Sequence, residues 1–181
     1  MSEGTPIGAG PGSPARVLGV DPGLAVTGWA VIEAGTPRPR LVASGVLRTR
    51  AREERSVRLH AITEGIAARI ATHAPREVAI EQQFVAENVR SAMAIGEARA
   101  AAMIAAAAAG LPVHTYAPTV VKESVAGYGG APKEQVREMV VLELALAEAP
   151  SPLDVSDAIA IALTRLAEAR FDARLRASGR P

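Results

Sequence analysis

The chain has 181 residues, of which 49% are hydrophobic, so it is long and apolar enough for one domain with one substantial core. Its formal net charge of +1 excludes a general basic field, so any nucleic-acid binding has to come from a local patch. The chain has no cysteine, which excludes disulfides, thiolate metal sites and a cysteine nucleophile.

The chain divides into a central domain and two tails. Residues 1–15 are rich in glycine and proline and have no apolar periodicity, which predicts a disordered tail. Residues 16–172 form the expected domain, and residues 173–181 form a basic tail. No apolar run reaches transmembrane length and no signal peptide is visible, so we expect a soluble, cytoplasmic protein without membrane association.

The first predicted strand ends in an aspartate. Residues 17–20 are mostly apolar, Asp21 follows them, and Pro22-Gly23 predicts a turn directly afterwards. Asp21 should therefore lie at the carboxyl end of a buried strand. A carboxylate there can anchor a metal or phosphate chemistry, and it can equally cap the turn through its own backbone.

A second strand end also carries a carboxylate. Strands near 27–33 and 41–48 are expected to continue an antiparallel meander, and an amphipathic helix from Ser56 to about Ala74 follows them. Residues 78–80 then predict a short strand that ends in Glu81. Because it follows a helix, this strand should lie parallel to the first.

The rest of the chain is predicted to be mainly helical. A helix over 90–109 contains an unbroken alanine run, which fits either a tightly packed core helix or a subunit contact. The later elements are a strand over 112–116, a short helix from Pro118, a mobile glycine-rich loop over 127–132, a helix from about Lys133 and a last helix from Ser151 to about Phe171.

Four carboxylates carry the predicted chemistry. Asp21 and Glu81 end neighbouring strands, and Asp154 and Asp157 are three residues apart, so they share one face of the last helix. Hard oxygen ligands suit Mg²⁺ or Mn²⁺ rather than zinc. Two such ions can activate a water and stabilise a leaving oxygen in phosphodiester cleavage.

These acidic residues also have simpler structural interpretations. Asp154 can serve the start of the last helix, since residues 151–154 resemble a capping box with Asp in place of Glu. Asp157 and Glu81 adjoin apolar residues, and buried acids are rare unless they are paired or metal-bound. The scattered histidines are read as ordinary helix or strand residues.

Taken together, the motifs resemble RuvC, the family of bacterial Holliday-junction resolvases, from about Val17 to Arg170. They occur in the order and spacing of the family: residues 18–23 with Thr27-Gly28, residues 80–84, 96–99, 121–122, 133–136 and 154–160. Three positions depart from the usual pattern, namely Glu87, Glu97 and Tyr128, and none of them is one of the four carboxylates.

The resemblance implies an α/β fold of the ribonuclease-H type, with a five-stranded mixed sheet flanked by helices. It implies a homodimer that nicks two strands of like polarity across a four-way DNA junction, and a partnership with the RuvA–RuvB branch-migration complex. The implied site holds divalent metal, expected as two Mg²⁺ ions with Mn²⁺ as a substitute, at Asp21, Glu81, Asp154 and Asp157.

Several further residues are candidates for DNA contact. Phe84 follows the active-site strand, where it can stack on an unpaired base or join the core. Tyr128 is a second stacking candidate or a solvent-facing tyrosine. Arg90 and Arg99 can meet phosphates from the helix over 90–109.

Two lysines stand out in a chain in which 18 of 20 basic residues are arginine. Lys122 and Lys133 flank the glycine-rich loop and match family positions implicated in catalysis, although solvated surface lysines are the plain reading. Lys133 lies in the first turn of a helix, where the helix dipole disfavours a cation, so we expect its charge to serve something outside that helix.

Three function classes are compared. The first is a metal-dependent junction endonuclease, with a related nuclease acting on other nucleic acids as its variant. The second is an ATPase of the actin and sugar-kinase type, which needs a second phosphate hairpin that this chain lacks. The third is a non-enzymatic junction-binding protein, which is disfavoured because all four carboxylates are present.

Overall fold

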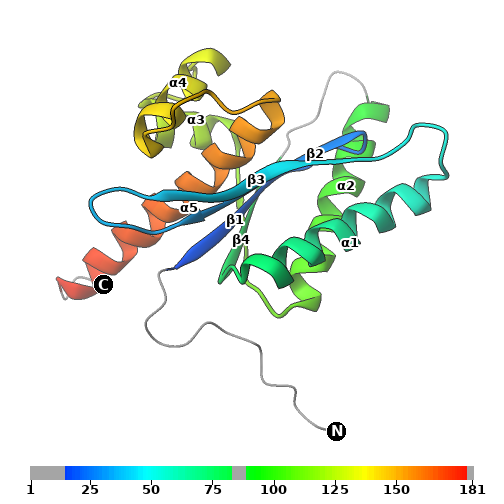
Figure 1. Cartoon of the computed structure of the whole chain (residues 1–181), viewed down its shortest axis with the longest axis horizontal. Coiled ribbons are helices and arrows are strands. Elements are labelled where there is room, and N and C mark those ends of the chain that lie inside the picture. Colours follow the sequence, from blue (N-terminus) through cyan, green and yellow to red (C-terminus); the bar gives the residue numbers. More distant parts are fainter. Residues whose placement is uncertain (1–14, 83–88, 179–181) are drawn as a thin grey trace, which may run out of the picture.

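The protein is built on one mixed sheet. The computed structural model describes residues 15–82 and 89–178 (Figure 1). The strands are β1 (Arg16–Asp21), β2 (Val26–Glu33), β3 (Arg40–Arg48), β4 (Glu77–Glu81) and β5 (Val113–Tyr116). Their order in the sheet is β3-β2-β1-β4-β5, with antiparallel pairing among β1 to β3 and parallel pairing of β4 with both β1 and β5. The predicted meander and the predicted parallel crossover are both confirmed.

Helices cover both faces of this sheet. They are α1 (Arg55–His73), α2 (Val89–Ala108), α3 (Pro118–Ala126), α4 (Lys133–Leu144) and α5 (Leu153–Ala177). One core lies between the sheet and α1 with α2, and the other lies between the sheet and α5 with α3 and α4. Successive strand residues point to opposite faces, so Val17 packs on the α5 side and Leu18 on the α1 side. Asp21 lies four residues after Val17 in the same strand, so its side chain points to the same face of the sheet, the one that α5 covers.

Two glycines allow α5 to lie directly on the sheet. A Cβ at Gly19 would collide with the carbonyl oxygen of Ala158, and one at Gly28 would collide with the carbonyl oxygen of Asp154. Gly28 pairs with Asp21 across β1 and β2. The first turns of α5, which carry Asp154 and Asp157, are thus brought close to the carboxyl end of β1.

The helix boundaries differ from the predicted ones mainly at the end of the chain. α5 continues past the expected end at Phe171 as far as Ala177, into the segment expected to be a basic tail. Gly127, with φ of 86°, ends α3 and opens the turn to α4. Of the predicted N-terminal tail, only Ala15 is described, and its carbonyl oxygen accepts a hydrogen bond from Ala34 N at 2.7 Å.

The helix α2 corrects one expectation. It is long and apolar enough to cross a membrane when judged by length and composition alone, whereas the sequence was expected to contain no such run. The helix carries Arg90, Glu97 and Arg99, and its buried alanines pack in the core on the α1 side of the sheet. Met93 and Ile104 lie on its exposed side.

Candidate active site

Asp21 and Glu81 lie side by side at the carboxyl edge of the sheet. Val20 pairs with Ile80 in the parallel register of β1 and β4. Asp21 and Glu81 directly follow this pair, so they end the two strands next to each other. The turn after Asp21 is held by Thr27, whose hydroxyl donates to the carbonyl oxygen of Gly23 at 2.7 Å. Burial of Asp21 and the neighbouring charges of Glu81, Asp157 and Asp154 raise the pKa of Asp21 to about 7.

The last helix supplies the other two carboxylates. The N-cap of α5 is Pro152, and no side chain caps this helix, so the capping-box interpretation of Asp154 is wrong. Asp154 instead lies in the first turn and Asp157 one turn further on. Burial raises the pKa of Glu81, and the charge of Asp157 raises it further. The four predicted carboxylates therefore act on one another electrostatically from three elements.

Lys133 pairs directly with one of these carboxylates. Its Nζ lies 2.9 Å from Oδ2 of Asp157, and this hydrogen bond raises the pKa of Lys133 despite partial burial. Lys133 is the first residue of α4, as predicted, and its charge indeed meets a group outside that helix. Lys133 also lines a small cavity of about 70 Å³. Lys122 on α3, Glu81 and Asp157 line this cavity too.

The donor set fits a hard divalent cation. All four candidate ligands are carboxylates. Burial first, and then their mutual repulsion, raises the pKa values of Asp21 and Glu81, and cations between the carboxylates relieve that repulsion. Within residues 15–82 and 89–178, no group of three or more acidic or histidine side chains already stands in metal-binding geometry.

The predicted DNA contacts are spread more widely than the carboxylates. Phe84 lies outside the described residues, so its stacking role stays a prediction. Arg90 and Arg99 belong to α2, on the face of the sheet opposite α5, and Nε of Arg99 is buried without a hydrogen-bond partner. Tyr128 is 51% exposed in the α3–α4 turn.

A second polar cluster lies between α5 and the strands β4 and β5. We call it the arginine network, and it consists of Arg165, Glu77, Glu168, Tyr116 and His114. Arg165 is 9% exposed and pairs with Glu77 through Nε and with Glu168 through Nη1 at 3.0 Å. The hydroxyl of Tyr116 donates to Glu168, and His114 Nε2 lies 3.1 Å from Glu77. Its members come from three elements, so the network joins α5 to β4 and β5.

Sequence reasoning missed the arginine network and the role of the two glycines. Gly19 and Gly28 look like ordinary strand glycines, and only the path of α5 shows why a side chain is excluded there. Glycine inside a strand is a signal for close backbone approach. That signal was available in the sequence.

A mixed sheet of this order, with carboxylates at two strand ends facing a pair on the last helix, defines a ribonuclease-H-like nuclease. The family model described as "Crossover junction endodeoxyribonuclease RuvC" matches residues 17–165. The chain belongs to the RuvC family.

Individual relatives agree with this assignment. The RuvC of Heliobacterium modesticaldum is 46% identical over 147 residues, covering 81% of this chain and 91% of the relative. The RuvC of Chloroflexus aggregans is 47% identical over 148 residues, covering 82% and 90%. Thermus thermophilus RuvC, solved in complex with a Holliday junction substrate, superposes with a TM-score of 0.83 at 37% identity and covers 87% of this chain and 96% of that one. The yeast mitochondrial resolvase Ydc2 shares the fold at a TM-score of 0.66 and 13% identity, over 92% and 85% of the two chains.

Proposed function

We propose that this protein is a divalent-metal-dependent endonuclease that resolves Holliday junctions by paired symmetric nicks in homologous recombination and DNA repair. The observation that carries this proposal is the gathering of Asp21, Glu81, Asp154 and Asp157 at one sheet edge, where their charges act on one another. Such a charge cluster disfavours the non-enzymatic alternative, because a protein that only binds junctions gains nothing from it.

Each side chain has a proposed role. The four carboxylates hold Mg²⁺, with Mn²⁺ as a substitute and two ions as the expected number. When bound, these ions supply an activated water and stabilise the leaving oxygen of the phosphodiester. The ammonium of Lys133, next to Asp157, would meet an oxygen of the scissile phosphate, and Lys122, which lines the same small cavity, would add a second positive charge.

Paired nicks require two active sites, and we propose that α2 provides the homodimer contact. Among its exposed apolar side chains are Val89, Met93 and Ile104, which are 69%, 58% and 60% exposed. An apolar face of this kind on a helix of a water-soluble chain marks an interface. The buried alanines of the opposite face pack in the α1-side core, so the proposed contact would use the face of α2 that the core leaves exposed.

The proposed function also implies a location, a partner complex and a residue that contacts DNA bases. We place the protein in the bacterial cytoplasm, acting on junctions together with the RuvA–RuvB branch-migration complex. Phe84 would stack on a base unpaired at the crossover, where base stacking contributes about 1–3 kcal/mol.

The direct test is incubation of the purified protein with a mobile four-way junction and Mg²⁺, followed by mapping of both nicks. We expect two nicks at symmetric positions on strands of like polarity, lost when the metal is chelated. Cleavage of single-stranded or linear duplex DNA in preference to the junction would instead indicate a related nuclease of different substrate class.

A further inference from the structure

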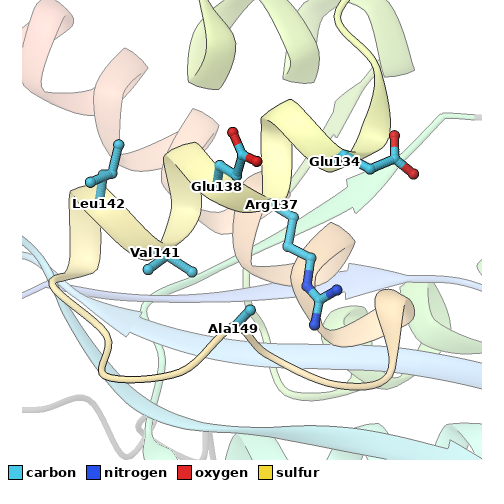
Figure 2. Close-up of a pocket in the computed structure, with 6 residues that line it drawn as sticks. All are labelled: Glu134, Arg137, Glu138, Val141, Leu142 and Ala149. Atoms are coloured by element: carbon cyan, nitrogen blue, oxygen red, sulfur yellow. The ribbon is translucent and has the colours of Figure 1, made fainter.

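A groove runs beside α4 on the same side of the molecule as the carboxylates. It has a volume of about 550 Å³ and lies between α4 and the segment that connects α4 to α5. Its lining residues are Glu134, Arg137, Glu138, Val141, Leu142 and Ala149 (Figure 2). None of these residues belongs to the candidate active site described above.

Arg137 is the distinctive residue of this groove. Its Nε is shielded from solvent and has no hydrogen-bond partner. Figure 2 shows its guanidinium extending toward Ala149, whereas the carboxylates of Glu134 and Glu138 point away from it. A guanidinium carries a permanent charge, and a buried donor without an acceptor is unfavourable unless a ligand completes it. Because the guanidinium is permanently charged, the ligand that would complete it best is an anion.

The position of Arg137 indicates which anion. It lies one helical turn after Lys133, a rise of about 6 Å along α4. Lys133 itself contacts Asp157 in the active site. Each strand of DNA rises about 3.4 Å per nucleotide, so this separation corresponds to one or two nucleotides. A guanidinium fork matches the oxygens of a phosphate.

We propose that Arg137 binds a backbone phosphate of the cleaved strand, one or two nucleotides from the scissile phosphate. This inference rests on the proposed function and adds to it a subsite that aligns the strand across the carboxylates. Val141 lies on the same side of α4 as Arg137, whereas Leu142 points away from it (Figure 2). Arg137 is thus a positioning residue, because it acts on the reaction by holding the strand.

The test removes the charge from each side of the contact in turn. Junctions carry one neutral methylphosphonate at successive positions around the cleavage site, and their affinity is measured in Ca²⁺, without cutting, for the wild type and for Arg137→Met. We expect one position at which the methylphosphonate weakens wild-type binding about tenfold and the variant hardly at all. Arg137→Met on unmodified DNA should lose a similar factor, and its salt dependence should fall by about one phosphate contact.

The controls separate this contact from general charge and from folding. Arg174→Met removes an exposed arginine near the far end of α5 and should leave affinity and the methylphosphonate pattern unchanged. Because the methylphosphonate scan on the wild type involves no protein substitution, it stands even if Arg137→Met is poorly folded. The inference is overturned if the scan of the wild type has no sensitive position within two nucleotides, or if Arg137→Met responds at that position as the wild type does. A wild type that does not cut junctions at all in Mg²⁺ would instead overturn the proposed function.

Discussion

Two groups of charged side chains lie beneath α5 on the same face of the sheet, and their charges are balanced in opposite ways. In the arginine network, Arg165 joins two glutamates, the hydroxyl of Tyr116 donates to Glu168, and Nε2 of His114 lies 3.1 Å from Glu77. In the carboxylate site, four acids from three elements face two lysines, of which Lys133 pairs with Asp157 and Lys122 borders the same small cavity. The hydrogen bond from Tyr116 lowers the pKa of Glu168, whereas burial and like charges raise that of Asp21.

The comparison shows how the face of the sheet under α5 can hold one charged group that stabilises the fold and another that serves catalysis. Buried charges persist in folded proteins when they are paired. The arginine network satisfies this condition within the chain. The carboxylate site does not, and the cations proposed for its reaction would complete it. The arginine network should therefore matter most for stability, and the carboxylate site most for cleavage.

The largest expected effect follows from removing a ligand. Asp157→Asn or Glu81→Gln should slow single-turnover nicking by at least about a thousandfold, because a lost metal ligand removes several kcal/mol of transition-state stabilisation. Junction affinity should stay close to wild type, since phosphate contacts supply it. Asp154→Asn should lose cleavage as well, because Asp154 does not cap α5. Near-normal nicking by the Asp157 variant would remove α5 from the mechanism.

Disrupting the arginine network should lower the stability of the fold rather than act directly on cleavage. Arg165→Met leaves Glu77 and Glu168 without their shared cation, which should lower the free energy of unfolding by about 3 kcal/mol, at the lower end of the range for buried pairs because Glu168 is partly exposed. Urea unfolding measures this loss. Arg174→Met, at an exposed position on the same helix, should change stability by no more than about 0.5 kcal/mol. Equal stabilities of the two variants would mean that the network contributes nothing measurable.

The cation of the carboxylate site can be exchanged without removing its charge. Lys133→Arg should bind junctions almost normally and cut them about a hundredfold more slowly, because a guanidinium is wider and planar and cannot give up its proton. Lys122→Arg should behave likewise if that residue reaches the scissile phosphate. Affinity and single-turnover rate on one junction at fixed salt measure both. Wild-type rates for both variants would show that the lysines supply only charge.

A smaller effect concerns pH in the presence of a chelator. The pKa of Asp21 is raised from 3.8 to about 7 in the folded chain, so its contribution to stability is full below pH 3.8 and is lost as the pH rises through about 7. Asp21→Asn should therefore gain stability relative to the wild type as the pH rises from 5 to 8, by about 1–3 kcal/mol. Unfolding free energies of both proteins across this range measure the difference. A difference that does not vary with pH would contradict the raised pKa.

The sequence was sufficient to predict the elements and the two strand ends that carry Asp21 and Glu81, and it failed where distant segments meet. Apolar periodicity and turn residues predicted the strand that ends at Asp21, because those signals are local. The pairing of Lys133 with Asp157 depends on how α4 meets α5, so the sequence indicated only that Lys133 serves something outside its helix. The arginine network joins residues that are up to 88 positions apart, and no local pattern marks Arg165 among so many arginines. The capping box at residues 151–154 was wrong because α5 begins after Pro152 without a side-chain cap.

The most direct test of the contrast between the two groups is the thermal midpoint of the wild type and of Asp157→Asn, with and without Mg²⁺ or Mn²⁺ at pH 8. A cation that binds only the folded carboxylate site stabilises it by about 2.7 kcal/mol at a hundred times its dissociation constant. The account predicts that saturating cation raises the midpoint of the wild type clearly and that of Asp157→Asn little. An equal rise in both proteins, or no rise in the wild type, would contradict it.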